Sequence, residues 1–211
     1  MPKDTFLNLP IEKQSLILDV AIKEFHDKGF DLASISSIVE KARIAKGSFY
    51  QYFDGKDDLF KHLVVIINDK KMQFVHPVIL AFDQLNFFDW FKKMLFATFD
   101  FLKNYPVLSK ISVDFWKHSN THTKERIFGE EMNRTQEFLA FFIEKAVLKN
   151  ELRNDISIKY LTSFISSQLA YFNDYLLELY DDLTLVSNDE LEKVVTTFMS
   201  TLEYGTKNIS K

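Results

Sequence analysis

The sequence predicts an all-α protein in which an N-terminal head of three short helices is joined by a long fourth helix to a C-terminal helical body. Apolar residues recur at helical spacing almost throughout the 211 residues. The 5 Gly and 4 Pro leave few residues for the tight turns that many-stranded folds need. A hydrophobic fraction of 46% and a charged fraction of 27% are typical of a globular protein with a sizeable core.

The first helix is expected to begin at Pro10, because proline is favourable in the first turn, and Glu12 lies there near the positive end of the helix dipole. Gly29 is expected to end it, since glycine readily adopts the left-handed conformation that follows a helix. Between them, one apolar stripe is predicted to face the interior: Leu16, Ile17, Val20, Ala21 and Phe25.

Two short helices complete the head. Ser34 is placed to cap the first of them, Ile35–Ala42. A turn, Arg43–Ala45, leads into the second, which runs from Lys46 to about Phe53 and ends at Asp54. We interpret these two helices and their turn as a helix-turn-helix.

The long fourth helix is expected from Lys56 to about Phe74, with Pro77 ending or kinking it. The head and the body are predicted as two domains, residues 1–55 and 56–211. Aromatic residues concentrate after the fourth helix, because 9 of the 32 lie in the first 74 positions and 23 in the remaining 137. The body is predicted to contain five more helices: Phe87–Asn104, Pro106–Lys117, Thr123–Lys149, Ser157–Tyr180 and Asp189–Tyr204.

Composition excludes several classes of protein. The absence of cysteine excludes disulfide frameworks, thiolate metal sites and cysteine nucleophiles. The N-terminal sequence lacks the regions of a secretory signal, and no apolar run approaches the roughly 20 residues that span a bilayer. We therefore expect a soluble, cytoplasmic protein. Its net charge of -4 gives no general attraction for nucleic acid, so any DNA contact must be local.

The helix from Lys46 to Phe53 has the side chains expected of a helix that enters the major groove of DNA. The outer face of such a helix must be small and polar to approach base edges. A set of this kind is present: Lys46, Gly47, Ser48 and Gln51. Phe49 and Phe53 are expected to be buried on the opposite face.

The spaced pattern from Ile17 to Leu59 resembles the TetR family of transcriptional regulators. The matching positions of the first helix are Ile17, Val20, Ala21, Phe25 and Gly29. The pattern continues with Ser34, Ile38 and Ala42, the run KGSFYQYF from Lys46 to Phe53, and Lys56 with Leu59. Several spaced matches in one register are more specific than a single helix-turn-helix motif.

The resemblance implies that the third helix enters the major groove and that a dimer binds an inverted-repeat DNA operator. It implies base or groove contacts by Lys46, Gly47, Ser48 and Gln51. It implies phosphate contacts by Ser34, Tyr50, Tyr52 and Lys56. Lys56 begins a helix whose dipole also favours an anion.

One residue departs from the family's pattern. Arg43 occupies the turn position where glycine is usual, so either the turn adjusts or the arginine contacts a phosphate itself. The surrounding charge favours DNA, because residues 34–56 hold four basic and two acidic side chains, a net of +2. A modest positive patch suffices when a dimer presents it twice.

The resemblance also implies that the body binds an effector and forms the dimer. The last two predicted helices carry wide apolar faces that a second subunit would cover. The predicted dimer contacts are Phe164, Gln168, Phe172, Tyr175, Val195, Phe198, Met199 and Leu202. The residues expected to line a pocket for an apolar or aromatic effector are Trp90, Met94, Phe99, Phe101, Phe115, Trp116, Phe142 and Tyr171. We expect a repressor that such a small molecule releases from DNA, with no cofactor.

Alternatives of other kinds are open. A regulator with the same head could be controlled by a protein partner instead of a small molecule, which a fully packed body would favour. An enzyme is disfavoured, because neither a repeated Glu-x-x-His nor a Gly-x-Ser-x-Gly element occurs. Asp114, His118 and His122 have metal-ligand spacing, but Ser119–Thr121 looks like a loop, so we expect surface histidines and no metal.

Overall fold

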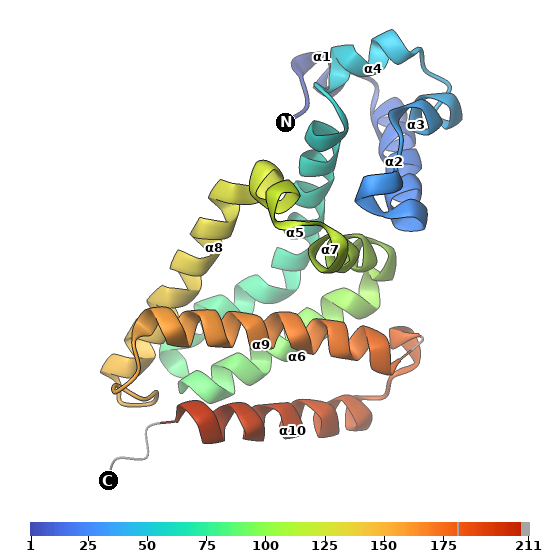
Figure 1. Ribbon diagram of the computed structural model, residues 1–211. Coiled ribbons are helices and arrows are strands. Elements are labelled where there is room, and N and C mark those ends of the chain that lie inside the picture. The colour runs from blue at the N-terminus through green and yellow to red at the C-terminus, as the bar shows by residue number, and fades with distance from the viewer. Residues whose placement is uncertain (181, 208–211) are drawn as a thin grey trace. The chain divides into compact units, whose positions relative to one another are not determined.

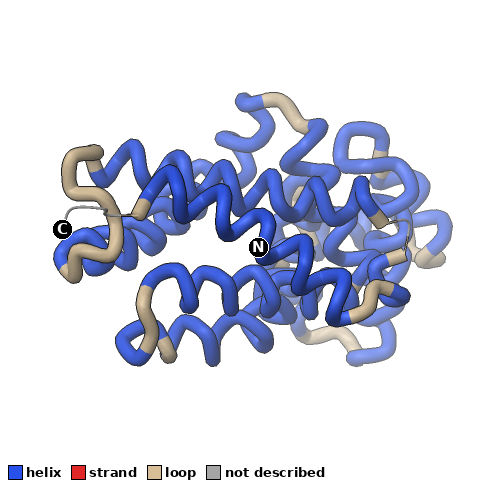
Figure 2. Tube along the Cα trace, turned by 90° about the horizontal axis from the view of Figure 1, so that it is seen from below, coloured by secondary structure: helices blue, strands red, loops and turns tan. Residues whose placement is uncertain are grey.

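The computed structural model describes residues 1–180 and 182–207, with all of their side chains except those of residues 130–135. Helices make up most of this described chain, and Figure 2 shows helices and loops along it but no strand. One isolated antiparallel bridge pairs Leu152 with Lys207. The predicted all-α fold class is confirmed.

The chain begins with a short helix, α1 (Asp4–Leu7), that the sequence did not predict. α2 (Ile11–Leu32) follows and has Pro10 as its N-cap. Gly29 has the expected positive φ of 70°, but helical structure resumes after it and continues to Leu32. The glycine therefore kinks α2 instead of ending it.

The next three helices correspond to the predicted helix-turn-helix and long connecting helix. They are α3 (Ile35–Lys41), α4 (Lys46–Tyr52) and α5 (Lys56–Leu80). α5 extends beyond the predicted Phe74 and contains Pro77. A proline removes one backbone hydrogen bond from a helix. The last turn of α5 gains another, because the Trp90 indole donates to the Val78 carbonyl at 3.0 Å.

Five long helices follow in the described part of the chain, as predicted, and short 3-10 turns at Phe82–Gln84 (η1) and Leu183–Leu185 (η2) precede two of them. A capping box formed by Ser187 and Glu190 begins the last helix. The helices are α6 (Phe87–Asn104), α7 (Pro106–His118), α8 (Thr121–Leu148), α9 (Ile158–Leu179) and α10 (Asn188–Thr206).

The chain forms two compact units, and α5 and α8 each pass from one to the other. Unit 1 comprises residues 1–70 and 105–129, and unit 2 comprises residues 71–104 and 130–211. Unit 1 therefore contains the helix-turn-helix together with α7, which packs on α2. The predicted boundary after residue 55, which separates DNA-binding and effector-binding functions, stays a prediction.

The core of unit 1 is built around phenylalanine side chains from helices that are distant in sequence. Phe60 of α5 contacts Phe25 of α2, with ring centroids 5.0 Å apart, and Phe115 of α7, at 4.8 Å. Phe30 contacts Phe115 at 5.4 Å. These contacts fix α2, α5 and α7 together beneath the helix-turn-helix.

The core of unit 2 is also aromatic. Phe142 of α8 lies 4.6 Å from the Phe82 ring and 4.9 Å from the Trp90 ring of α6. α9 and α10 run side by side (Figure 1), and Phe172 contacts Phe198 across them at 4.9 Å. In the part of the chain described here, no helix has the length and apolar character needed to cross a membrane.

Candidate nucleic-acid interface

α3 begins at a side-chain cap that the sequence predicts. The Ser34 hydroxyl oxygen accepts a hydrogen bond from the Ser37 N–H at 3.1 Å. Ile38 and Val39 then face the core, because they are buried. The cap stabilises the start of a helix too short to be stable alone.

The turn between α3 and α4 keeps a left-handed residue even though it lacks glycine. Arg43 has a φ of 53°. Its N–H donates to Glu40 O at 3.1 Å, and the Ile44 N–H donates to Val39 O at 3.0 Å. These two bonds form a Schellman motif, which usually has glycine at the left-handed position. The turn therefore has glycine-like geometry, and the exposed Arg43 side chain points away from the core.

A buried carboxylate that the sequence analysis missed joins α2 to α3. Glu24 is 1% exposed. Its carboxylate accepts hydrogen bonds from the Ser37 hydroxyl at 2.7 Å, the Ser34 N–H at 3.3 Å, Lys28 Nζ at 2.6 Å and Lys41 Nζ at 2.8 Å. Glu24 follows Ala21 by three positions, so its place on the apolar stripe was a signal in the sequence.

The protonation state of Glu24 follows from these partners. Burial by itself raises the pKa of the carboxyl, but the hydrogen bonds from two lysines, Ser37 and Ser34 outweigh it and hold the pKa at about 2. Glu24 is therefore ionised at neutral pH. It holds the start and the end of α3 against α2 with directional bonds.

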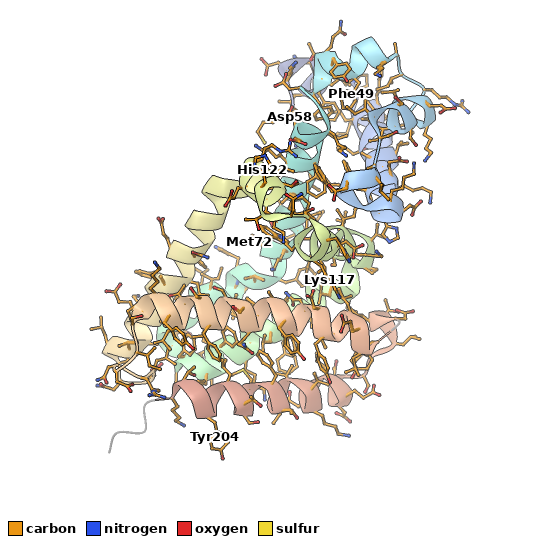
Figure 3. The ribbon with its side chains drawn as sticks, in the orientation of Figure 1. Phe49, Asp58, Met72, Lys117, His122 and Tyr204 are labelled. Atoms are coloured by element: carbon orange, nitrogen blue, oxygen red, sulfur yellow. The ribbon has the colours of Figure 1, made fainter. Side chains whose placement is uncertain are left out.

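The outer face of α4 lies where the sequence predicts it. Phe49 and Phe53 are 0% exposed and anchor the opposite face; Figure 3 labels Phe49 in this region. A Cβ built on Gly47 would meet nothing within 4 Å, so the fold itself does not require glycine there. The exposed or half-buried residues of this outer face are Lys46, Gly47, Ser48, Tyr50 and Gln51.

Tyr52 does not lie on the outer face. It is 7% exposed, and its ring is 6.1 Å from that of Phe6. The predicted phosphate contact is at odds with this placement. Tyr52 follows Phe49 by three positions, which puts both side chains on the buried face of one helix.

Lys56 is also placed differently from the prediction. Its ammonium donates to three carbonyls at the end of α2, Phe30 O at 2.7 Å, Asp31 O at 3.0 Å and Ala33 O at 3.1 Å. It lies 4.7 Å from the Phe30 ring centroid, and burial lowers its pKa. Lys56 therefore caps α2 and is not a free cation for a phosphate.

Fewer positive charges are therefore free to meet DNA than the four basic residues counted in the sequence of this region. Of the four basic residues in positions 34–56, Lys41 and Lys56 bind groups of the chain itself. Arg43 and Lys46 have exposed side chains, and we find no ion pair for either within residues 1–180 and 182–207. These two cations flank the start of α4.

The residues predicted to line an effector pocket are divided between the two units. Phe115 and Trp116 lie in unit 1, whereas the other six lie in unit 2. Trp116 and Tyr171 are 42% and 59% exposed. Met94 is half-buried, and the remaining residues are buried core side chains: Trp90, Phe99, Phe101, Phe115 and Phe142.

Two surface pockets lie elsewhere. One of about 300 Å³ in unit 1 is lined by residues 26–32 and by α7 residues such as Lys110 and Asp114. The other, of about 420 Å³ in unit 2, is lined mainly by polar side chains such as Asn86, Asp89 and Glu203. Neither contains a residue predicted to bind the effector.

Four of the eight residues predicted to contact a second subunit are buried within the chain itself. Four side chains are already covered within unit 2, because α10 packs against α6 and Phe172 packs against α10. They are Phe172, Val195, Met199 and Leu202. The other four keep exposed surface: Phe164, Gln168, Tyr175 and Phe198.

The histidines considered as metal ligands are separated by a helix break. α7 ends at His118 and α8 begins at Thr121. The Asp114 carboxylate pairs with Lys110. Among the side chains that the structure describes, no group of three His, Asp or Glu could hold a metal ion.

Comparison with known proteins gives a family match over the region that contains the helix-turn-helix. Residues 17–63 match the family model described as bacterial regulatory proteins, tetR family. The uncharacterized HTH-type transcriptional regulator YdgC of Bacillus subtilis (strain 168) is 33% identical over 104 residues. These residues are 48% of this chain and 53% of YdgC, so the match spans about half of each protein.

Solved structures share the fold over nearly the full chain. A TetR family transcriptional regulator from Chloroflexus aurantiacus J-10-fl has a TM-score of 0.70 at 24% identity, covering 98% of this chain and 99% of that one. The regulator FadR from Bacillus subtilis, solved in complex with stearoyl-CoA, has a TM-score of 0.62 at 19% identity, covering 86% and 97%. At these identities the likeness is one of fold.

Proposed function

This chain belongs to the tetR family of bacterial regulatory proteins, and we propose that it is a DNA-binding transcriptional regulator, acting in the cytoplasm as a homodimer on an inverted-repeat operator. The observation that carries the proposal is the two-sided character of α4. Phe49 and Phe53 anchor one face in the core, and the other face presents small and polar groups to the outside. A helix with such a face fits the major groove.

Roles follow from the placement of each side chain. We assign base contacts to Lys46, Ser48 and Gln51, and close backbone approach to Gly47. Arg43, Tyr50 and Ser34 are assigned to phosphates, since the first two are exposed and Ser34 is half-buried at a helix start. Tyr52 and Lys56 have no place in this set, because the chain itself uses them.

The dimer is proposed to form through α9. A stripe that is aromatic or apolar except at Gln168 repeats every three to four residues along this helix and keeps exposed surface: Tyr160, Phe164, Gln168, Tyr171, Tyr175 and Leu179. Tyr160, Tyr171 and Leu179 are 61%, 59% and 45% exposed. A face of this kind is stabilised when a second copy covers it.

Effector control is proposed through the body. A hydrophobic or aromatic small molecule is favoured, because the core of unit 2 is aromatic and because FadR of Bacillus subtilis, which shares the fold, holds stearoyl-CoA. We propose that the effector releases the regulator from DNA, so that it acts as a repressor. Release requires the effector to bind the DNA-free state of the dimer more tightly than the DNA-bound state.

The DNA proposal is tested by selecting bound fragments from random duplexes. We expect an inverted repeat whose half-sites lie about 34 to 36 Å apart, one helical turn of DNA. Gln51→Ala should then alter the selected bases, whereas Gln136→Ala, at an exposed position of α8, should not. A wild-type protein that enriches no sequence would refute the proposal.

Two further measurements test the dimer and the effector. Tyr171→Glu should give monomers in sedimentation, whereas Tyr204→Glu should not, because Tyr204 lies on α10, outside the α9 stripe, and its side chain points outward from that helix (Figure 3). Stearate and stearoyl-CoA should release DNA, and coenzyme A alone should not. Release by coenzyme A alone would mean that the body recognises a polar group, contrary to the proposal.

A further inference from the structure

The last carbonyls of α4 need hydrogen-bond donors from outside the helix. The last four carbonyls of any α-helix have no partner within it. In α4 the Phe49 carbonyl accepts from the Phe53 N–H at 2.9 Å. The carbonyls of Tyr50, Gln51 and Tyr52 are left, and two of these residues carry side chains of the outer face.

Two residues near the N-terminus donate to all three carbonyls. The Lys3 N–H donates to Tyr52 O at 2.9 Å, and Lys3 Nζ donates to Tyr50 O at 3.0 Å. The Thr5 hydroxyl donates to Gln51 O. The lysine charge also lies at the negative end of the α4 dipole, which stabilises the helix end.

A buried side chain holds this segment in place. α1 lies beside α4 (Figure 1). Phe6 of α1 is 0% exposed, and its ring centroid is 4.8 Å from Phe53 and 5.8 Å from His62. Lys3 is held further by an ion pair with Asp54 at 2.6 Å, just after the end of α4. The donors are therefore fixed against both α4 and α5.

We propose that Lys3, Thr5 and Phe6 form an N-terminal clamp that positions the C-terminal half of α4 for base recognition. The proposal rests on the proposed function. The clamp holds the backbone of Tyr50 and Gln51 while leaving their side chains free to meet DNA. Loss of the clamp moves Gln51 relative to Lys46 at the other end of α4. Contacts to bases depend on such placement, whereas general attraction to phosphates does not.

The test compares affinity for the selected operator with affinity for an unrelated duplex of equal length, at one salt concentration. Thr5→Val removes the hydroxyl donor and keeps the shape, and Thr5→Ser restores the donor. Lys3→Met removes the ammonium and keeps most of the stem. Lys13→Met, at an exposed position of α2, is the control for loss of one positive charge. The thermal midpoint of each variant is measured alongside.

We expect Thr5→Val and Lys3→Met each to lower the ratio of operator to non-specific affinity by about fivefold, the effect of about one hydrogen bond. Thr5→Ser should keep the wild-type ratio, and Lys13→Met should change both affinities alike. If Thr5→Val is folded and keeps the wild-type ratio, the clamp is overturned and the proposed function still stands. If Thr5→Val is unfolded at the assay temperature, an unchanged ratio in Lys3→Met has the same meaning. A wild type without preference for any duplex overturns both.

Discussion

The two compact units both have aromatic cores, but they differ in their buried polar side chains. In unit 1 an ionised carboxylate, Glu24, is buried and bonds to donors on α2 and α3. In unit 2 the buried polar side chains, among the described residues, are threonines that donate to carbonyls of their own helices, such as Thr98 to Met94 O and Thr162 to Ile158 O.

This difference suits the two proposed tasks. Directional bonds between elements specify one arrangement, because each donor must meet its acceptor at a set distance and angle. Aromatic packing specifies shape less strictly and tolerates exchange of side chains of similar volume. Directional bonds between α2 and α3 therefore suit the DNA reading proposed for unit 1, and a core without such bonds suits the apolar effector proposed for unit 2.

The largest expected effect is on Glu24. Glu24→Gln keeps the volume but removes the charge that Lys28 and Lys41 bind. We expect it to lower the free energy of unfolding at pH 7 by about 3 kcal/mol, which corresponds to a pKa of about 2 against 4.5. Denaturant unfolding measures this loss. Glu144→Gln, at an exposed position of α8, should cost less than about 0.5 kcal/mol.

The same residue gives a pH dependence. Folding lowers the pKa of Glu24, so the ionised carboxylate contributes fully to the free energy of unfolding above pH 4.5. This contribution is lost as the pH falls from about 4.5 toward 2. The wild type should therefore lose more stability over this interval than Glu24→Gln. Parallel curves for the two proteins would show that the carboxylate is not the stabilising species.

The next effect concerns Lys56. Lys56→Met removes three charge-assisted bonds to the end of α2 and should lower the free energy of unfolding by about 2 kcal/mol. Lys61→Met, at a half-buried position of the same helix, is the control. The salt dependence of DNA binding should not change. Lys56 would instead be a phosphate contact if Lys56→Met were as stable as the wild type and the slope of log binding constant against log salt concentration fell by about 1.

A smaller effect is expected in unit 2. Phe142→Leu removes one ring from the contacts with Phe82 and Trp90, and neighbouring side chains can fill much of the space. We expect a loss of about 1 kcal/mol, measured by denaturant unfolding. A loss larger than that of Glu24→Gln would mean that the aromatic core is as strictly specified as the bonds of unit 1.

The smallest expected effect is an increase in the free energy of unfolding. Arg43→Gly removes the strain of a left-handed arginine but adds flexibility to the unfolded chain, so we expect a gain of about 0.5 kcal/mol. If Arg43 contacts a phosphate, the same variant should bind the operator more weakly. Calorimetry and binding measured together separate the two consequences, and Arg43→Asn, which also tolerates this conformation, is the matched variant.

Features that depend on neighbours along the chain were predictable from the sequence. Helix starts such as Ser34 and Ser187 were predictable, because a cap bonds within three residues. The buried and exposed sides of α4 followed from the spacing of Phe49 and Phe53. The all-α class and the order of the helices followed in the same way from apolar periodicity.

The three-dimensional packing was needed to show which side chains bond to other groups of the same chain. Lys56 bonds to carbonyls 23 to 26 positions earlier, and Lys3 bonds to one 47 positions later. Phe172 is covered by α10, so it is not available to a second subunit. A local pattern records that such a residue is charged or apolar, but not which distant group it meets, because that depends on how the helices pack.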